Sequence, residues 1–316
     1  MSAVPVLDPA RLDSGKTSDP GARIRRTRWR RVRLAVVYVI LIPGGLLFVV
    51  PFIWLLSASF QPVSDIFSWP PQWIPRHPTL DGYKQFFGAG GSAAGMWFLN
   101  SAFVSISVTV LQLFCNSLAA YVFAKRKFPG RSVIFLLFLA TMMVPPQVTM
   151  IPNYLILQHI PLFGGNDLFG AGGHGWLDSY EGLILPGCVS AFGIFLLRQY
   201  MTSIPDELLD AARIDGASEF RIYAQVVLPL CRPVLAATAI FTFMAAWEDF
   251  LWPLIIISDP NKFTAPLGLA LFVMKNQTSW SVLLAGSVIA TLPMVVVFAV
   301  FQRQFVQGIA MSGLKG

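Results

Sequence analysis

Long apolar stretches without a single Asp, Glu, Lys or Arg set the pattern of hydrophobic and polar positions in this chain. There are five such stretches, at 34–56, 98–124, 132–157, 182–197 and 280–302. A sixth stretch, 233–257, is equally apolar except for Glu248 and Asp249. About 20 consecutive apolar residues in a helix match the thickness of the hydrocarbon core of a bilayer. The pattern therefore predicts an all-α polytopic membrane protein with six transmembrane helices, of which the one at 182–197 is the shortest.

Proline residues interrupt several of these predicted helices, and the strongest interruption lies in the middle of 132–157. Pro145 and Pro146 are followed there by Gln147. A proline frees a backbone carbonyl, which a membrane helix tolerates where neighbouring helices or water can hydrogen-bond to it. The break is typical of a helix that lines a cavity, and Pro145 and Gln147 are therefore candidate residues of a path through the membrane.

Basic residues predict the orientation of the helices. With the N-terminus inside, the outer segments hold four basic residues, so the other 19 of the 23 Lys and Arg lie inside. Those four are Arg76, Lys84, Lys262 and Lys275. Positive residues concentrate on the cytoplasmic side of membrane proteins. Both termini are therefore predicted to be cytoplasmic, and the net charge of +7 reflects membrane topology and not nucleic-acid binding.

The beginning of the chain predicts a tail in front of the membrane domain. Residues 1–33 are polar and then basic, and they are predicted to form a disordered cytoplasmic tail. Residues 34–316 are predicted to form the transmembrane domain. Gly15-Lys16-Thr17 resembles the end of a phosphate-binding loop, but Ala10 stands where the first glycine of that loop belongs. No nucleotide site is therefore assigned to this chain.

One long polar insert, at about 203–230, favours helical structure and separates two apolar stretches. Pro205 and the two acids after it are typical of the first turn of a helix, with Ser203 as the predicted N-cap. Gly216 is predicted to end this helix in the left-handed conformation, and Ser218 to cap a second short helix. Because a plain connector would be shorter, the insert predicts a cytoplasmic helix–break–helix that is presented to a soluble partner.

The insert also carries a recognisable motif. Asp210-Ala211-Ala212, Gly216 and Leu228-Pro229 stand at the spacing of the "EAA" loop, with Asp210 in place of the usual Glu. The chain thereby resembles the permeases of binding-protein-dependent ABC importers, over nearly all of its length beyond residue 34. The segments similar to the second permease half of maltose-type transporters are 69–83, 100–101, 247–254 and 302–308, although Glu248 stands where that family more often has Asn.

The resemblance implies the fold of a type I ABC importer permease and a division of labour between subunits. This chain would form half of the path for a sugar or oligosaccharide in the prokaryotic cytoplasmic membrane. The implied partners are a second, different permease, two ATPase subunits, an extracytoplasmic solute-binding protein and membrane lipid. ATP and Mg²⁺ are expected on the ATPase subunits. This chain itself is therefore expected not to be an enzyme and not to bind a cofactor. The residues implied to couple it to an ATPase are Asp210, Ala211, Ala212, Asp215, Gly216, Leu228 and Pro229.

Two interpretations of Glu248 and Asp249 stay open. In one, they line the translocation path together with Trp247 and Trp252, whose indoles could stack on sugar faces. In the other, they form hydrogen bonds between helices and touch no substrate. Exposing a charged side chain to lipid costs about 2.5 kcal/mol or more on insertion scales. Under both interpretations the two carboxylates therefore face protein or a cavity.

Functions of two other classes fit the pattern poorly. An ion-coupled secondary carrier should show internal repeats and several paired charges within its spans, and only Glu248 and Asp249 qualify. An intramembrane enzyme should show a nucleophile or metal motif, but neither His-Glu-x-x-His nor Gly-x-Ser-x-Gly occurs. The three His and three Cys have no metal-ligand spacing. The importer permease is the prediction, and the ion-coupled secondary carrier is the alternative.

Overall fold

A computed structural model of the chain describes residues 20–89, 92–275 and 280–313; most of these residues are helical and none of them is in a β-strand. The main helices of the bundle and the N-terminal helix are α1 Pro20–Ala58, α4 Ser92–Lys125, α8 Ala191–Thr202, α12 Arg232–Glu248 and α15 Trp280–Gly313. The other helices are α2 Val63–Ile66, α3 Asp81–Ala89, α5 Arg131–Thr141, α6 Pro146–Gln158, α7 Tyr180–Ile184, η2 Leu185–Gly187, α9 Asp206–Ile214, α10 Glu219–Ile222, η3 Tyr223–Val227, α11 Leu228–Leu230, α13 Leu251–Ile256, η4 Pro260–Lys262 and α14 Ala265–Lys275.

The chain divides into two units, Met1–Leu55 and Leu56–Gly316. The described part of the first unit is residues 20–55 of the long helix α1, which contains Pro43 and Pro51. This helix begins at Pro20, so residues 20–33 are helical where the sequence predicted a disordered tail. Arginine is a good helix former, and proline is favoured at the first helical position, so the basic segment extends the apolar helix that follows it. Residues 1–19 of the predicted tail lie outside the described residues.

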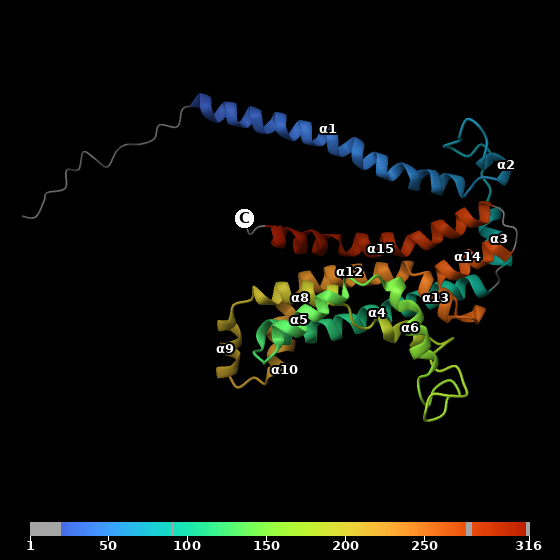
Figure 1. The fold of residues 1–316 in the computed structure, drawn as a ribbon. Coiled ribbons are helices and arrows are strands. Elements are labelled where there is room, and N and C mark those ends of the chain that lie inside the picture. The colour runs from blue at the N-terminus through green and yellow to red at the C-terminus, as the bar shows by residue number, and fades with distance from the viewer. Residues whose placement is uncertain (1–19, 90–91, 276–279, 314–316) are drawn as a thin grey trace, which may run out of the picture. The chain divides into compact units, whose positions relative to one another are not determined.

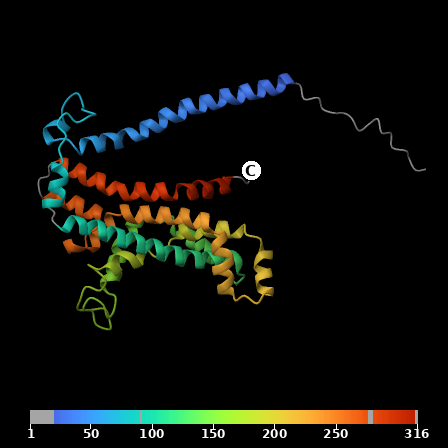
Figure 2. The same ribbon diagram turned by 180° about the vertical axis from the view of Figure 1, so that it is seen from behind.

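The second unit is built around α4, which packs against α8 and α12, while α12 also packs against α15 (Figures 1 and 2). A close contact between a glycine and an amide side chain joins α8 to α4. A Cβ added at Gly193 of α8 would lie 2.3 Å from the side-chain nitrogen of Asn116 on α4. A larger residue at this position would therefore have to displace the buried Asn116 side chain. Small residues at helix interfaces are typical of membrane bundles.

Three pairs of helices are sharply bent at short breaks. The bend is 100° between α5 and α6, 41° between Tyr180–Gly187 and Ala191–Thr202, and 80° between Glu219–Leu230 and Arg232–Glu248. The described residues contain three helices long and apolar enough to cross a membrane, or up to six spans if each bent pair is one span. The number of six spans therefore stays a prediction. The break predicted at Pro145-Pro146 is confirmed, since Pro145 precedes α6 and Pro146 is its first residue.

The second unit has two distinct ends. At one end, α9 lies across the bundle next to α10 (Figure 1). At the other end lie α3, α6, α13 and α14 (Figures 1 and 2). Leu209 of α9 and Ile222 of α10 are almost fully buried in a cluster with Leu197, Met201 and Val234. Burying one such side chain contributes about 1.5–3 kcal/mol, so apolar contacts hold the 203–230 insert against the bundle.

Candidate functional site

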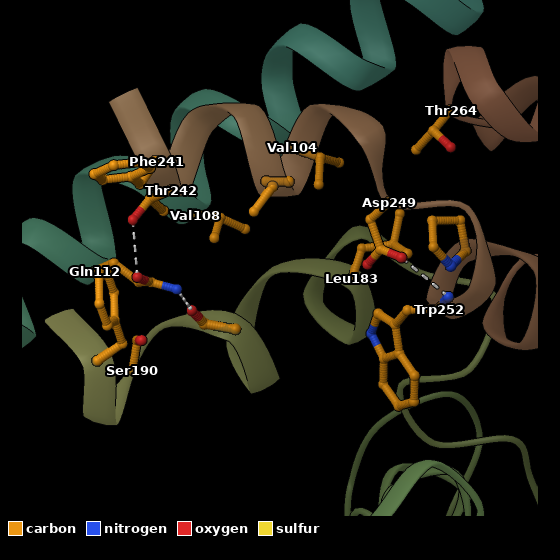
Figure 3. A pocket seen from close by; sticks show the side chains of 15 residues that line it. Val104, Val108, Gln112, Leu183, Ser190, Phe241, Thr242, Asp249, Trp252 and Thr264 are labelled. Carbon is orange, nitrogen blue, oxygen red and sulfur yellow. Dashed lines mark hydrogen bonds between the residues drawn. The ribbon is translucent and has the colours of Figure 1, made fainter. Parts of the chain in front are cut away.

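A cavity of about 470 Å³ lies inside the second unit, between α4, α7, η2, α8, α12 and α13 (Figure 3). This volume is within the range of small-molecule sites in proteins. Its wall is mostly apolar, with a few polar groups. The lining residues are Val104, Val108, Gln112, Leu183, Gly187, Ser190, Phe192, Phe241, Thr242, Ala245, Ala246, Asp249, Trp252, Pro253 and Thr264.

Gln112 of α4 is the centre of the polar groups on one side of this cavity. Its Nε2 donates a hydrogen bond to the carbonyl oxygen of Gly187 at 2.7 Å, and its Oε1 accepts one from Thr242 Oγ1 at 3.0 Å (Figure 3). One turn further along α4, the side-chain oxygen of Asn116 accepts a hydrogen bond from the backbone N–H of Ser190 at 3.0 Å. The break between η2 and α8 leaves these backbone groups without helical partners, and a membrane interior requires them to be satisfied. The side chains of Gln112 and Asn116 supply the missing hydrogen bonds.

Asp249 and Trp252 form the other polar side of the cavity. Helix α12 ends at Glu248, and Asp249 takes an extended conformation with φ −64° and ψ 120°. Its Oδ1 accepts a hydrogen bond from the backbone N–H of Trp252 at 3.3 Å, at the start of α13 (Figure 3). The indole Nε1 of Trp252 donates to the carbonyl oxygen of Gly182 at 3.1 Å. The helix break thus directs the Asp249 carboxylate to the cavity instead of to lipid.

The structure separates the residues that the sequence grouped as a substrate path. Asp249 and Trp252 line the cavity, but Trp247 is only 3% exposed and donates from its Nε1 to the carbonyl oxygen of Ala290 at 3.0 Å. Glu248 opens into a different groove, between α12, α14 and α15. The backbone break after Glu248 explains this separation, because it ends the helical periodicity that joins neighbouring positions to one face.

Pro145 and Gln147 are exposed at the break between α5 and α6, and neither lines the cavity. Two cavity residues that the sequence reasoning missed are Gln112 and Thr242. Their signal was present, because an amide and a hydroxyl occur inside otherwise apolar stretches. The sequence reasoning weighed charged residues and breaks, and uncharged polar residues within the spans were left unassigned.

The beginning of α9 differs from the prediction. Pro205 is the N-cap residue of α9 and makes no side-chain cap hydrogen bond. The predicted cap, Ser203, instead follows the end of α8, and its Oγ donates to the carbonyl oxygen of Tyr200 at 2.7 Å. Proline disfavours a helical conformation in the residue before it, so Ile204 separates α8 from α9 and the new helix cannot begin at Ser203.

The end of α9 and the start of α10 agree with the prediction. Gly216 has φ +76°, in the left-handed region that glycine adopts at little cost. Ser218 caps α10, because its side chain accepts a hydrogen bond from the backbone N–H of Arg221. The insert 203–230 therefore has the helix–break–helix form that the sequence indicated.

The predicted coupling residues fall on two faces of this insert. Asp210, Ala211, Asp215, Gly216 and Pro229 are exposed, while Ala212 and Leu228 are half-buried and pack on the cluster around Leu209. The Asp210 carboxylate is paired with Arg213 Nη1 at 2.6 Å. The strip of α9 around Ala211 and Gly216 is thus open to solvent, between the exposed Asp215 and the paired carboxylate of Asp210. The described part of the chain contains no cluster of side chains suited to a metal ion.

Comparison with known proteins identifies the family. Residues 116–311 match the model of the binding-protein-dependent transport system inner membrane component. The chain is 35% identical, over 90% of its length and 96% of the relative, to the arabinooligosaccharides transport system permease protein AraQ of Bacillus subtilis (strain 168). It is 33% identical, over 87% of its length and 95% of the relative, to the sn-glycerol-3-phosphate transport system permease protein UgpE of Yersinia pestis bv. Antiqua (strain Antiqua).

The fold also matches a solved structure of a bacterial ABC transporter involved in the import of the acidic polysaccharide alginate. The TM-score is 0.72 at 23% sequence identity, and the match covers 88% of this chain and 98% of the other. The family model covers more than half of the chain, and the two relatives are matched over nearly their whole length. The chain belongs to the family of binding-protein-dependent transport system inner membrane components, the permease subunits of ABC importers.

Proposed function

We propose that this permease forms half of a translocation path for a sugar or oligosaccharide, and that the cavity between α4, α8 and α12 contacts the substrate. The observation that carries the proposal is the presence of an indole, a carboxylate and an amide around one cavity of about 470 Å³. A sugar presents hydroxyl donors and acceptors at its edge and apolar C–H groups on its faces. Trp252 would stack on a face, while Asp249 and Gln112 would bond hydroxyls.

The relatives support a saccharide as the substrate class. AraQ is described as part of an arabinooligosaccharides transport system, and GanQ of Bacillus subtilis (strain 168), 32% identical to this chain, as part of a galactooligosaccharides transport system. UgpE is described as transporting sn-glycerol 3-phosphate, a smaller polyol with a charged group. The Asp249 carboxylate in the cavity favours a neutral polyhydroxy compound over a phosphate, because two negative groups repel each other where the dielectric constant is low.

The other subunits follow from the same proposal. Transport requires a second, different permease to complete the path, two ATPase subunits that bind ATP and Mg²⁺, and an extracytoplasmic solute-binding protein. The exposed strip of α9 around Ala211 and Gly216 would seat in a cleft of one ATPase subunit, on the cytoplasmic side together with both termini. The family assignment argues against the ion-coupled secondary carrier, because these permeases depend on a binding protein.

Purification tests the subunit composition. The tagged chain would be purified from native membranes and the bound proteins identified by mass spectrometry. We expect a second multi-span protein and an ATPase in near-stoichiometric amounts. Recovery of the chain alone, in a form that transports without an ATPase, would overturn the proposal.

Two neighbouring carboxylates allow a sharp test of the cavity. Uptake of labelled arabinooligosaccharides, galactooligosaccharides and sn-glycerol 3-phosphate would be measured in cells whose only copy of this gene carries Asp249→Asn or Glu248→Gln. The two substitutions remove the same charge, but only Asp249 lines the cavity. We expect Asp249→Asn to raise KM about tenfold for the transported compound, because a charge-assisted hydrogen bond becomes a weaker neutral one, and Glu248→Gln to leave KM unchanged. Equal effects of both substitutions would contradict the role of the cavity.

A further inference from the structure

Three side chains on one face of α4 bond to the 203–230 insert. Ser117, Tyr121 and Lys125 are spaced four residues apart, so they form a single row along the helix. The hydroxyl of Ser117 lies 2.7 Å from that of Tyr223, in a buried hydrogen bond. The hydroxyl of Tyr121 donates to Glu219 Oε2 at 2.8 Å. The row therefore contacts the insert at successive levels up to the end of α4.

Lys125 ends this row and contacts the beginning of α9. Its Nζ lies 2.7 Å from Asp206 Oδ1 and also donates to the carbonyl oxygen of Ile204. The Lys125 side chain is only 4% exposed, whereas that of Asp206 is 76% exposed. The hydrogen bond and the positive charge of Lys125 hold the pKa of Asp206 below its ordinary value. A buried ammonium is costly unless it is paired and hydrogen-bonded, and these two acceptors pair it.

Glu219, at the start of α10, joins this row to the rest of the insert. Besides the Tyr121 hydroxyl, its carboxylate is bonded by Arg126 Nη1 at 2.5 Å and by Arg213 Nε at 3.1 Å. Arg126 follows α4, and Arg213 belongs to α9, where it also pairs with Asp210. One carboxylate thus ties α9 and α10 to the end of α4. We name Ser117, Tyr121, Lys125 and Arg126, with their partners in the insert, the α4 clamp.

The same helix lines the cavity. Val104, Val108 and Gln112 of α4 are also spaced four residues apart and belong to the cavity wall. Helix α4 contains no proline and no break between Ser92 and Lys125. Lys125 lies thirteen positions after Gln112, which corresponds to about 20 Å of helix. Helix α4 is therefore an unbroken rod between the cavity and the clamp.

The helices joined covalently to the insert are less direct connections. On one side, the chain leaves α8 at Thr202 and passes through Ile204-Pro205 before α9 begins. On the other side, a π-helical segment, Tyr223–Val227, and an 80° bend precede α12. Both connections contain a hinge that can absorb part of a displacement, since a π-helical segment and a proline are common sites of helix bending. The clamp on α4 has no such hinge.

We propose that the α4 clamp is a separate, non-covalent route by which displacement of the 203–230 insert reaches the cavity, with Tyr121 and Lys125 as its positioning residues. This inference rests on the proposed coupling of α9 to an ATPase. When the ATPases move α9, the clamp carries α4 with it, and the wall formed by Val108 and Gln112 shifts. The clamp residues contact neither substrate nor nucleotide; they act through α4.

The test measures movement on α4 and on α8 separately. Single cysteines would be placed at Val108 on α4 or at Phe192 on α8, both cavity-lining residues, in a chain whose Cys115, Cys188 and Cys231 are replaced by Ala. The complete transporter with its own ATPase subunits would be treated with a small methanethiosulfonate reagent. The modification rate would be compared without nucleotide and after trapping with Mg-ATP and vanadate. In the otherwise unmodified chain we expect trapping to change both rates about fivefold, near the lower end of allosteric coupling.

The clamp is then broken by Ser117→Ala, Tyr121→Phe, Lys125→Met and Arg126→Met together. We expect the response at Val108 to fall below about twofold while that at Phe192 persists, because α8 is joined to the insert by the chain itself. A full response at Val108 in this variant would overturn the inference. If trapping changes the modification rate at neither position in the otherwise unmodified chain, the proposed coupling of α9 to an ATPase is wrong. The clamp then transmits no movement either.

A milder variant keeps the inference testable if the quadruple variant disturbs the fold. Tyr121→Phe removes only the hydroxyl that bonds to Glu219 and keeps the ring. Its matched control is Tyr200→Phe. The Tyr200 hydroxyl donates to the carbonyl oxygen of Leu230 at 3.2 Å, and this bond joins α8 to α11 without involving α4. We expect Tyr121→Phe to reduce the response at Val108 selectively and Tyr200→Phe not to do so. Equal reductions at Val108 and Phe192 caused by Tyr121→Phe would show a general loosening and contradict the proposal.

Discussion

The two ends of the second unit are held together by different kinds of interaction. At one end, the 203–230 insert is helical, and ionic and hydroxyl side chains connect it to α4. At the other end, the 159–178 segment contains no helix, and hydrogen bonds to its own backbone hold it, such as that from the N–H of His174 to the carbonyl oxygen of Gly164 at 3.0 Å. Asn166 donates to the carbonyl oxygens of Gln158 and Ile160 and accepts from the N–H of Gly173.

Glycines decide the conformation of that second segment. Gly164, Gly170 and Gly175 have positive φ, and a Cβ at each would lie 2.1–2.2 Å from a backbone oxygen. The composition of this segment suggests a flexible loop, but its glycines are needed at tight turns. The difference between the two ends is informative. Side-chain bonds between helices can break and form again as helices move, whereas a backbone packed this closely keeps one shape.

Gly216→Pro should have the largest effect on transport. Proline fixes φ near −65° and has no N–H, but Gly216 has φ +76° and its N–H donates to the carbonyl oxygen of Arg213 at 3.0 Å. The change should cost about 3 kcal/mol locally and turn α10 away from α9, so that uptake is lost while the chain still inserts into the membrane. Uptake assays with quantification of the membrane-inserted chain would measure this.

Gly216→Ala is the control for that prediction. No atom lies within 4 Å of a Cβ at this position. The substitution therefore lowers stability only by the free energy of placing alanine in the left-handed conformation, about 1 kcal/mol. We expect partial loss of uptake. Normal uptake by Gly216→Pro would remove the turn, and with it the coupling role of the insert, from the mechanism.

Gly175→Ala should have the next largest effect, at the opposite end. Gly175 has φ +58°, and a Cβ would lie 2.1 Å from the carbonyl oxygen of Leu157. The conformation alone costs about 1–3 kcal/mol, and the clash adds to this. The apparent Tm of the purified transporter should fall, which differential scanning fluorimetry would detect.

Gly172→Ala separates the two causes. Gly172 has φ +98°, but the nearest atom to its Cβ would be 3.8 Å away, so only the conformational cost applies. We expect a smaller decrease in Tm than for Gly175→Ala. Equal decreases would mean that close packing does not hold this segment, and the contrast between the two ends would disappear.

The end of α9 and the start of α10 were predictable from the sequence, whereas the N-cap of α9 was not, and the composition of the cavity was predictable only in part. The left-handed conformation of Gly216 and the helix cap at Ser218 depend on residues nearby in the sequence, and both were predicted correctly. Trp247 and Trp252 are five positions apart in one apolar stretch, yet one is packed against α15 and the other lines the cavity. The helix break between them depends on tertiary contacts, such as the bond from Trp252 to Gly182, which no local pattern encodes.

Asp178→Ala should have an intermediate effect on stability. The Asp178 carboxylate accepts hydrogen bonds from the backbone N–H groups of Ser258 and Asp259 at 3.1 and 3.0 Å, and it lies 3.5 Å from Lys262 Nζ. Burial opposes its ionisation, but these donors and the lysine keep its pKa below the ordinary value. Losing hydrogen bonds to a charged group should cost about 1.5–3 kcal/mol, measured as a lower Tm.

The pH dependence of that effect has a definite sign. Because the pKa of Asp178 is lower in the folded state, its contribution is present above the ordinary value, about 3.9, and is lost as pH falls through the folded value. The Tm difference between the natural chain and Asp178→Ala should therefore be constant near neutral pH and shrink below about pH 4. A difference that grows on acidification would contradict this account of the carboxylate.

The smallest effect is expected for Asp206→Asn, at the clamp. Lys125 lowers the pKa of Asp206 by a hydrogen bond and by its charge, so this pair also stabilises the fold above about pH 4 and weakens on acidification. The Asp206 carboxylate is 76% exposed, however, and exposed ion pairs contribute at most about 1 kcal/mol. We therefore expect a small decrease in Tm at pH 7 that disappears at high salt, whereas the decrease caused by Asp178→Ala should persist because backbone N–H donors are screened less. Equal salt sensitivity of the two variants would show that both ends depend on surface charge, and the clamp would then differ from the opposite end only in its position.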